Sequence, residues 1–258
     1  NCYATGNVIG YDYGGGLIGK SNNSVQNCYA TGAATGNNAG GLIGDSYSSV
    51  KNCYATGNVK GSTIAGGLLG VSYGPVQNCY ATGIATGYAA SLTMAGGLIG
   101  LSTGSSSTQD CYSSGSASGD IAGGFIGRFS SGSATNCYTD GGVSGGIVGG
   151  FIGEICNGGS AVTITGCTSL ITTVSGTSKS GSFVGGARAT SGTGALSGIA
   201  FNSCACVEAY GVDKIGGVYD NSLNPISYDK SQWENNIKSI NSFFKLKTIV
   251  WFISKFNL

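Results

Sequence analysis

The chain has 258 residues, only 9% of which are charged, and its formal net charge is +1. A surface with so little charge lacks the basic patch that nucleic-acid binding requires, so we expect no nucleic-acid partner. The sequence contains no histidine, which excludes Ser-His-Asp and Cys-His nucleophilic sites and most zinc sites.

One sequence unit recurs about eight times between Asn1 and Asp220. Its second half reads GGLIG, GGLLG or GGFIG, and its first half reads NCYATG in the clearest copies. A unit of about 25 residues cannot bury its own apolar face, so the copies must stack on one another to form a core. The first half starts at Asn1, Asn27, Asn52 and Asn78, and less faithfully at Asp110 and Asn136.

Composition decides between helical and strand repeats. The chain has 49 glycines, and each glycine costs a helix interior about 1 kcal/mol relative to alanine. The segment Cys2-Tyr3-Ala4-Thr5 alternates with period two, as a strand with two different faces does. We therefore predict an all-β fold, a parallel β-solenoid over residues 1–220, with about eight coils of 25 to 37 residues and two or three short strands in each.

Stacked copies place equivalent residues in ladders along the solenoid axis. Small apolar Cys and Ala suit the interior, which leaves Tyr and Thr on the outside. The opposite wall is predicted to hold Leu17, Leu42, Leu68, Leu98, Phe125, Phe151, Phe183 and Val218. The outward ladder is a possible binding face, formed by Tyr3, Thr5, Tyr29, Thr31, Tyr54, Thr56, Tyr80, Thr82, Tyr112 and Ser114.

The residue after each GLIG-type motif gives a separate check of this register. Lys20 and Asp45 occupy this position in neighbouring coils, and so do Arg128 and Glu154. Opposite charges therefore fall beside one another, as exposed pairs that contribute at most about 1 kcal/mol each.

The ten cysteines favour a buried thiol ladder over a disulfide framework. Eight of them recur once per coil, and in-register neighbours would have parallel Cβ vectors, which fit disulfide geometry poorly. Free cysteine behaves as a small buried hydrophobe. No CxxC pair is present, so a zinc site is disfavoured. A bridge involving Cys156, Cys204 or Cys206 stays open.

The NCYATG segments followed by Gly16-Leu17-Ile18-Gly19 and its copies resemble the GLUG-repeat family. The resemblance covers residues 1–155 well, residues 156–220 weakly, and the tail not at all. It implies a module of an extracellular or cell-surface protein, such as a stalk, a fibre or an adhesive domain. It implies no catalytic residues, because in such proteins the chemistry usually resides in other domains.

The residues themselves also indicate no active site. The chain has 11 acidic residues, and they do not repeat side by side at one coil position, as a glycoside-cleaving groove would need. Asp12, Asp120 and Asp140 are interpreted as solvated turn residues. We predict no catalytic, cofactor-binding or metal-ligating residues and no cofactor.

Residues 221–258 form a separate C-terminal segment. Ser231 and Glu234 fit a capping box, and apolar residues follow at helical spacing, so a short amphipathic helix is predicted. The apolar run over residues 248–253 is too short to span a bilayer. The segment either caps the last coil or attaches to a neighbouring subunit or a membrane surface. Its anchors would be Trp233, Ile237, Ile240, Phe244, Trp251 and Phe252.

Two functional interpretations follow. The first is a non-enzymatic structural or adhesive module that binds itself, other surface proteins or carbohydrate, with a filament subunit joined head to tail as one form of it. The second is an ice-binding protein that uses the Tyr/Thr ladder to order water. The chain begins inside a unit, so we expect it to be a portion of a longer protein.

Overall fold

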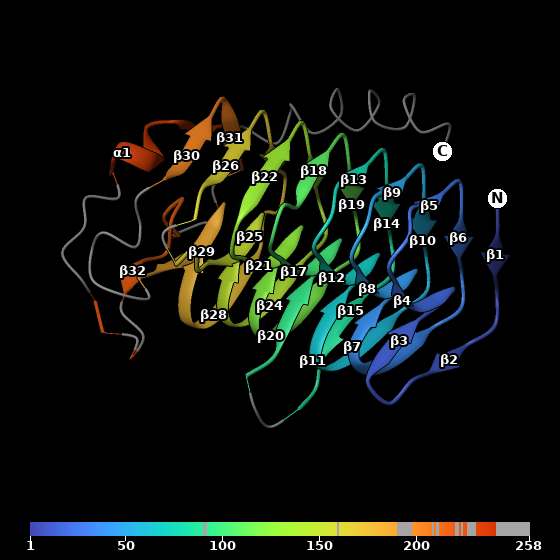
Figure 1. Ribbon diagram of the computed structural model, residues 1–258. Coiled ribbons are helices and arrows are strands. Elements are labelled where there is room, and N and C mark those ends of the chain that lie inside the picture. Colours follow the sequence, from blue (N-terminus) through green and yellow to red (C-terminus); the bar gives the residue numbers. More distant parts are fainter. Residues whose placement is uncertain are drawn as a thin grey trace.

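The predicted parallel β-solenoid is confirmed by the computed structural model of the chain (Figure 1). The structure describes residues 1–89, 92–158, 160–189, 198–207, 209, 212–219, 222, 224–225 and 231–240. In this part of the chain, parallel strands stack in four sheets that run along the solenoid axis. In each of the first seven coils the chain therefore passes through four sheets, instead of the two or three strands expected.

Sheet A carries the NCYATG segments, and its strands are listed here in spatial order: β1 (Tyr3–Ala4), β6 (Tyr29–Ala30), β10 (Tyr54–Ala55), β14 (Tyr80–Ala81), β19 (Tyr112–Ser113), β23 (Tyr138–Thr139), β27 (Thr168–Ser169), β31 (Cys204–Cys206) and β33 (Ile237–Ser239). Sheet B follows the first seven of these segments, and it contains β2 (Val8–Ile9), β3 (Tyr13–Gly15), β7 (Ala34–Gly40), β11 (Val59–Gly66), β15 (Ala85–Gly87), β16 (Met94–Gly96), β20 (Ala117–Gly123), β24 (Val143–Gly149) and β28 (Val174–Gly181).

Sheet C carries the end of each GLIG-type motif, in strands β4 (Ile18–Ser21), β8 (Ile43–Ser46), β12 (Leu69–Ser72), β17 (Ile99–Ser102), β21 (Ile126–Phe129), β25 (Ile152–Ile155), β29 (Val184–Arg188) and β32 (Val218–Tyr219). Sheet D closes the coil with β5 (Val25–Gln26), β9 (Val50–Lys51), β13 (Val76–Gln77), β18 (Ser107–Gln109), β22 (Gly132–Thr135), β26 (Val162–Thr165) and β30 (Ile199–Asn202).

The glycines of the GGLIG motif form the corner between sheets B and C. In one coil β7 ends at Gly40 and β8 starts at Ile43. A Cβ atom on Gly40 would lie 1.9 Å from the carbonyl oxygen of Ile43, so only glycine fits this tight bend. The extra sheet arises here, because the corner divides the GGLIG motif, which looks like one apolar segment in the sequence, between two strands.

The asparagine of NCYATG forms another corner. Asn27, Asn52 and Asn78 have φ between 52° and 54°, in the left-handed region that asparagine tolerates better than other non-glycine residues. Their side chains also form a ladder, because the amide of Asn52 donates to Oδ1 of Asn27 at 3.0 Å and that of Asn78 donates to Oδ1 of Asn52 at 3.3 Å. The repeated Asn therefore determines where the chain turns into sheet A.

The main core holds the cysteine, alanine and leucine ladders. Cys53, Cys79, Leu42 and Leu68 are all buried, which confirms the predicted inward ladders, although Cys2 in the first coil is exposed. The rings of Phe125, Phe151 and Phe183 continue the leucine ladder, with centroids 4.7 Å and 5.0 Å apart.

The prediction that Val218 is the last residue of this ladder is wrong. The backbone N–H of Phe183 donates to the carbonyl of Lys214 at 3.0 Å, and Val218 pairs with Ala187 instead. The glycine pair before Val218 resembles the start of a GGLIG motif. However, Gly216 lies beside Gly185, where a Cβ would approach the Gly185 carbonyl oxygen to 2.3 Å. Spacing alone could not distinguish a glycine at the start of the motif from one at its end.

The predicted C-terminal helix is wrong beyond its first turn. Helix α1 spans Ser231–Glu234 only, and Ile237 begins strand β33, which pairs with β31 at the end of sheet A. The free edge of β31 offers unpaired backbone hydrogen-bonding groups. The two asparagines after α1 are poor helix formers, so edge pairing replaces the helix.

Candidate functional site

Among the described residues, the tyrosine face of sheet A is a regular exposed feature. The rings of Tyr3, Tyr29, Tyr54 and Tyr80 stack in register, with neighbouring centroids 5.1, 4.8 and 4.8 Å apart and interplanar angles of 8° or less. Tyr3 is 66% exposed, and the next three tyrosines are half-buried. Each ring is therefore held by its neighbours while one edge remains in solvent.

Hydroxyl side chains follow the tyrosines along the same face. The structure places Thr5, Thr31, Thr56 and Thr82 on the surface, each directly after a short strand of sheet A, and Ser114 is half-buried. The predicted face is thus brought together over its first four coils as alternating rings and hydroxyls.

The face changes character at Asp140. The hydroxyls of Tyr112 and Tyr138 donate to its two carboxylate oxygens at 3.1 Å and 3.2 Å. Tyr138 is fully buried, and burial raises the pKa of Tyr112 to about 12. Asp140 is therefore a partner that ends the exposed ladder, and its interpretation as a solvated turn residue is wrong.

The thiols behind this face are unsuited to nucleophilic chemistry. The cysteines of the described chain are free, and Cys79, Cys111 and Cys137 are buried. Each thiol is hydrogen-bonded; the Cys79 Sγ donates to the Gln77 carbonyl at 3.1 Å. Burial raises the pKa values of these three thiols well above the ordinary value. They remain protonated and act as packing groups.

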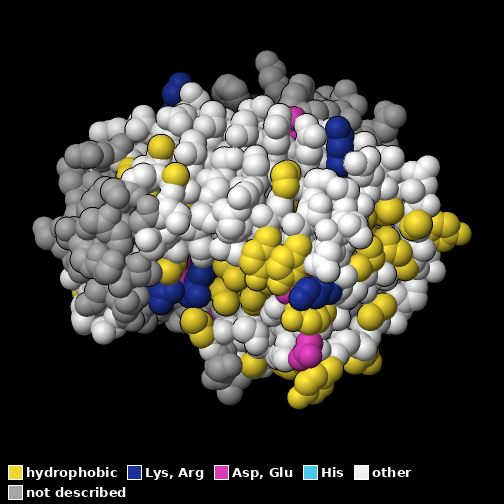
Figure 2. All heavy atoms as spheres, in the orientation of Figure 1, with side chains coloured by type: hydrophobic (Ala, Val, Ile, Leu, Met, Phe, Trp, Pro, Cys, Tyr) yellow, Lys and Arg dark blue, Asp and Glu magenta, His cyan; other side chains and the backbone are white. Residues whose placement is uncertain are grey.

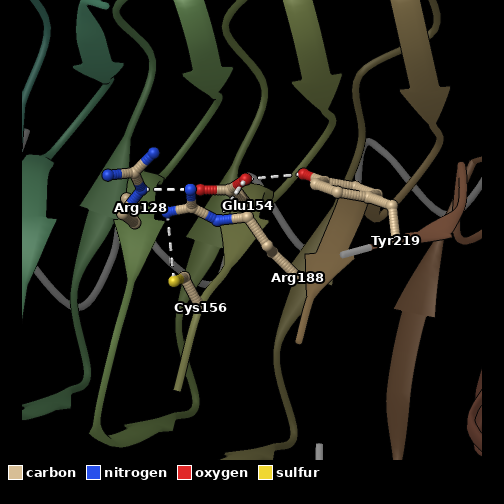
Figure 3. A network of polar contacts seen from close by, with 5 residues as sticks. All are labelled: Arg128, Glu154, Cys156, Arg188 and Tyr219. Atoms are coloured by element: carbon tan, nitrogen blue, oxygen red, sulfur yellow. Dashed lines mark hydrogen bonds and ion pairs between the residues drawn. The ribbon is translucent and has the colours of Figure 1, made fainter. Parts of the chain in front are cut away.

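A buried polar network lies on the outer side of sheet C (Figure 3). Glu154 is 1% exposed and accepts from Arg128 Nε at 2.6 Å and from the Tyr219 hydroxyl at 2.6 Å. Arg188 Nε lies 3.4 Å from the same carboxylate, and Arg188 Nη2 donates to Cys156 Sγ at 3.2 Å. The predicted register of Arg128 beside Glu154 is confirmed, but the pair is not exposed as expected.

The other predicted pair also differs from an exposed ion pair. Lys20 and Asp45 are in register, yet Lys20 Nζ lies over the rings of Tyr13 and Tyr47, at 5.4 Å and 4.8 Å from their centroids. Asp45 is buried and accepts from the Asn38 amide at 3.0 Å. Burial raises the pKa of Asp45. Outward residues are buried here because sheets B and C fold toward each other, so that Ile64 of β11 and Val71 of β12 belong to one buried cluster. The sequence pattern did not reveal this packing.

The anchors of the C-terminal segment pack on this chain's own last coil. Trp233 and Ile237 are buried in the main core, and the Trp233 ring lies 6.2 Å from that of Phe201. Ile240 is partly buried beside a small cluster that includes Val207. Phe244, Trp251 and Phe252 lie outside the described residues.

Among the residues that the structure describes, no group of three or more Cys, Asp or Glu side chains could hold a metal ion. No helix in this part of the chain has the length and apolar character needed to cross a bilayer. Figure 2 shows a face with few charged side chains, as the composition indicated.

Comparisons with known proteins agree with this architecture. The family model of the GLUG motif matches residues 35–60, so the chain carries that motif. No curated protein matches the sequence. The crystal structure of a putative immunoglobulin A1 protease from Bacteroides ovatus is similar, with a TM-score of 0.57 and 20% identity. The match covers 84% of this chain and 65% of that one, and at this identity it shows the fold alone.

Proposed function

We propose that this GLUG-motif chain is a non-enzymatic structural and adhesive module of a secreted or cell-surface protein. The solenoid provides a rigid frame, and the tyrosine face of sheet A is its contact surface. The GLUG motif and the solenoid neighbour support a surface module. The protease name describes that neighbour alone.

One observation carries this proposal: the rings of Tyr29, Tyr54 and Tyr80 are fixed parallel at 4.8 Å spacing before any partner arrives. Binding costs free energy when side chains must be ordered, and pre-stacked rings avoid much of that cost. Tyrosine also combines a large apolar area with a hydroxyl, which suits contact with proteins and glycans. A long, uncharged and rigid ladder is therefore well suited to adhesion.

Surface retention tests the proposal. Beads coated with the natural chain should be retained on mucin-coated or collagen-coated surfaces. Thr56→Lys, which places a long charged side chain in the middle of the face, should lower retention at least about tenfold, the effect of ~1.4 kcal/mol. Thr163→Lys is the control, because Thr163 is a partly exposed threonine of β26 on sheet D, away from the tyrosine face. Absence of retention on both surfaces, or equal retention of the Thr56 and Thr163 variants, would refute the adhesive face.

Ice binding is the alternative use of the same face, favoured by the regularly placed surface hydroxyls of Thr31, Thr56 and Thr82. Thermal hysteresis of the purified chain, abolished by Thr56→Lys and kept by Thr163→Lys, would support this alternative. Ordinary ice growth at high protein concentration would remove it.

A further inference from the structure

A second surface feature lies on sheet B, away from the tyrosine face. A hollow of about 560 Å³ opens between Tyr88 and strands β20, β24 and β28, which lie in consecutive coils (Figure 1). This volume is within the range of small-molecule binding sites.

The floor of the hollow combines hydroxyls with bare backbone. Ser118, Ser144 and Ser175 are in register on neighbouring strands, so their side chains form one row. The next residues, Gly119 and Gly145, carry no side chain. A Cβ on Gly145 would lie 1.7 Å from the Gly119 carbonyl oxygen, and its φ of 149° also favours glycine. A ligand can therefore approach the backbone closely beside a row of hydroxyls.

Asp120 is held at the edge of this floor in a fixed orientation. It lies within β20, not in a turn as expected from the sequence. Its Oδ2 accepts from the Thr93 N–H at 2.8 Å and from the Thr93 hydroxyl at 3.1 Å, and its own N–H donates to that hydroxyl at 2.9 Å. Within the described residues these side-chain contacts use Oδ2 alone, so Oδ1 of this exposed residue can accept from a ligand.

Tyr88 supplies an apolar wall. Its side chain is 56% exposed, while its backbone N–H is anchored to the Gly61 carbonyl at 3.1 Å. An aromatic ring offers a flat apolar surface. A ring, an oriented carboxylate and a row of hydroxyls match a ligand that has an apolar C–H face and many hydroxyl groups.

We propose that this hollow binds a neutral saccharide chain. Asp120 is the one charged residue among the described residues that line it, so an anionic ligand would be repelled. An extended peptide would need a free strand edge, but β20 and β24 are paired on both sides. The site is on sheet B and goes beyond the proposed adhesive face, so either one can fail while the other stands.

The test is titration of the full chain with neutral and acidic hexasaccharides by calorimetry. We expect at least one neutral hexasaccharide to bind, and Asp120→Asn and Tyr88→Ala each to weaken its Kd about tenfold, because a charge-assisted hydrogen bond or a ring contact is lost. Matched controls are Asp12→Asn and Tyr11→Ala, since both residues are exposed on the same side of the coil and do not line the hollow. These controls and Thr56→Lys should bind as the natural chain does.

Thermal unfolding of each variant shows whether it is folded. No binding to any neutral hexasaccharide would overturn the proposal. Equal Kd values for a folded Asp120→Asn variant and its Asp12→Asn control, or preference for the acidic hexasaccharides, would also overturn it.

Discussion

Tyr219 donates a hydrogen bond of 2.6 Å to Glu154, which lies 65 residues earlier in the chain. This contact links strand β32 near the end of sheet C to β25. Glu154 also contacts Arg128 and Arg188, so these four residues form a buried charged network on the outward face of sheet C. Burial, together with Coulombic repulsion from Glu154, raises the pKa of Tyr219 well above its ordinary value, so the phenol remains a donor.

Glu154→Gln should destabilise the chain strongly. Removal of one partner from a buried ion pair leaves the other charge uncompensated and costs about 3–5 kcal/mol, and here two arginines lose their carboxylate. Tyr219→Phe should cost less, about 1.5–3 kcal/mol, since it removes one hydrogen bond to a charged group. Denaturant unfolding measures both changes. Asp12→Asn at an exposed site is the control, and a Glu154→Gln change no larger than that of the control would contradict the role of the network.

Leu68→Ala should cost about 2–5 kcal/mol, because Leu68 is fully buried in the main core. Ile84→Ala is the matched control, since the Ile84 side chain is 48% exposed and surface changes usually stay within about 0.5 kcal/mol. The free energy of unfolding in urea checks both. If the two truncations have equal effects, the assignment of the leucine ladder to the core is incorrect.

The thiols should divide into two classes in native protein. Cys2 is exposed and Cys156 is partly exposed, so both should react with a thiol reagent within minutes, whereas Cys79, Cys111 and Cys137 should react only after unfolding. Burial also raises the pKa of Cys204 to about 11, which places it in the slow class. Mass spectrometry of labelled peptides distinguishes the classes. Fast labelling of Cys79 without loss of structure would argue against an inward thiol ladder.

Stability should fall in alkaline solution. Burial raises the pKa values of Tyr80 and Tyr112 from 10.0 to about 12. The unfolded chain therefore releases these protons first, so the stabilisation is complete below pH 10 and is lost as the pH rises toward 12. The free energy of unfolding should decrease between about pH 10 and pH 12, and less so in a Tyr80→Phe, Tyr112→Phe variant. An identical decrease in that variant would assign the effect to other groups.

Removal of residues 231–258 distinguishes the two roles of the C-terminal segment. The pairing of β33 with β31 favours the cap, and its loss should expose the edge of sheet A and promote aggregation. If the segment instead joins subunits head to tail, the truncated chain should stay monomeric while the full chain forms filaments. Light scattering and negative-stain microscopy measure these outcomes. Identical assembly and stability of the two chains would exclude both roles.

The sequence by itself determined the repeating part of this protein. The alternation of Cys2-Tyr3-Ala4-Thr5 predicted which side chains face inward, and the constant spacing predicted the register that pairs Tyr54 with Tyr29 and Tyr80. These features are local, since each coil repeats the same side chains beside their equivalents. The corner at Asn52, whose φ is 53°, is also local but was not predicted. Its signal in the sequence is the asparagine or aspartate that precedes most of the repeat cysteines.

Only the tertiary structure decided the features that depend on how sheets meet. Glu154 is buried because sheets B and C fold toward each other at the glycine corner, and its partners Arg188 and Tyr219 come from strands with no shared sequence signal. Ile237 forms a strand, not a helix, because the edge of β31 is available to pair with it. In both cases distant segments pair each other's backbone hydrogen-bonding groups or buried charges. Periodicity within one segment cannot encode such pairing.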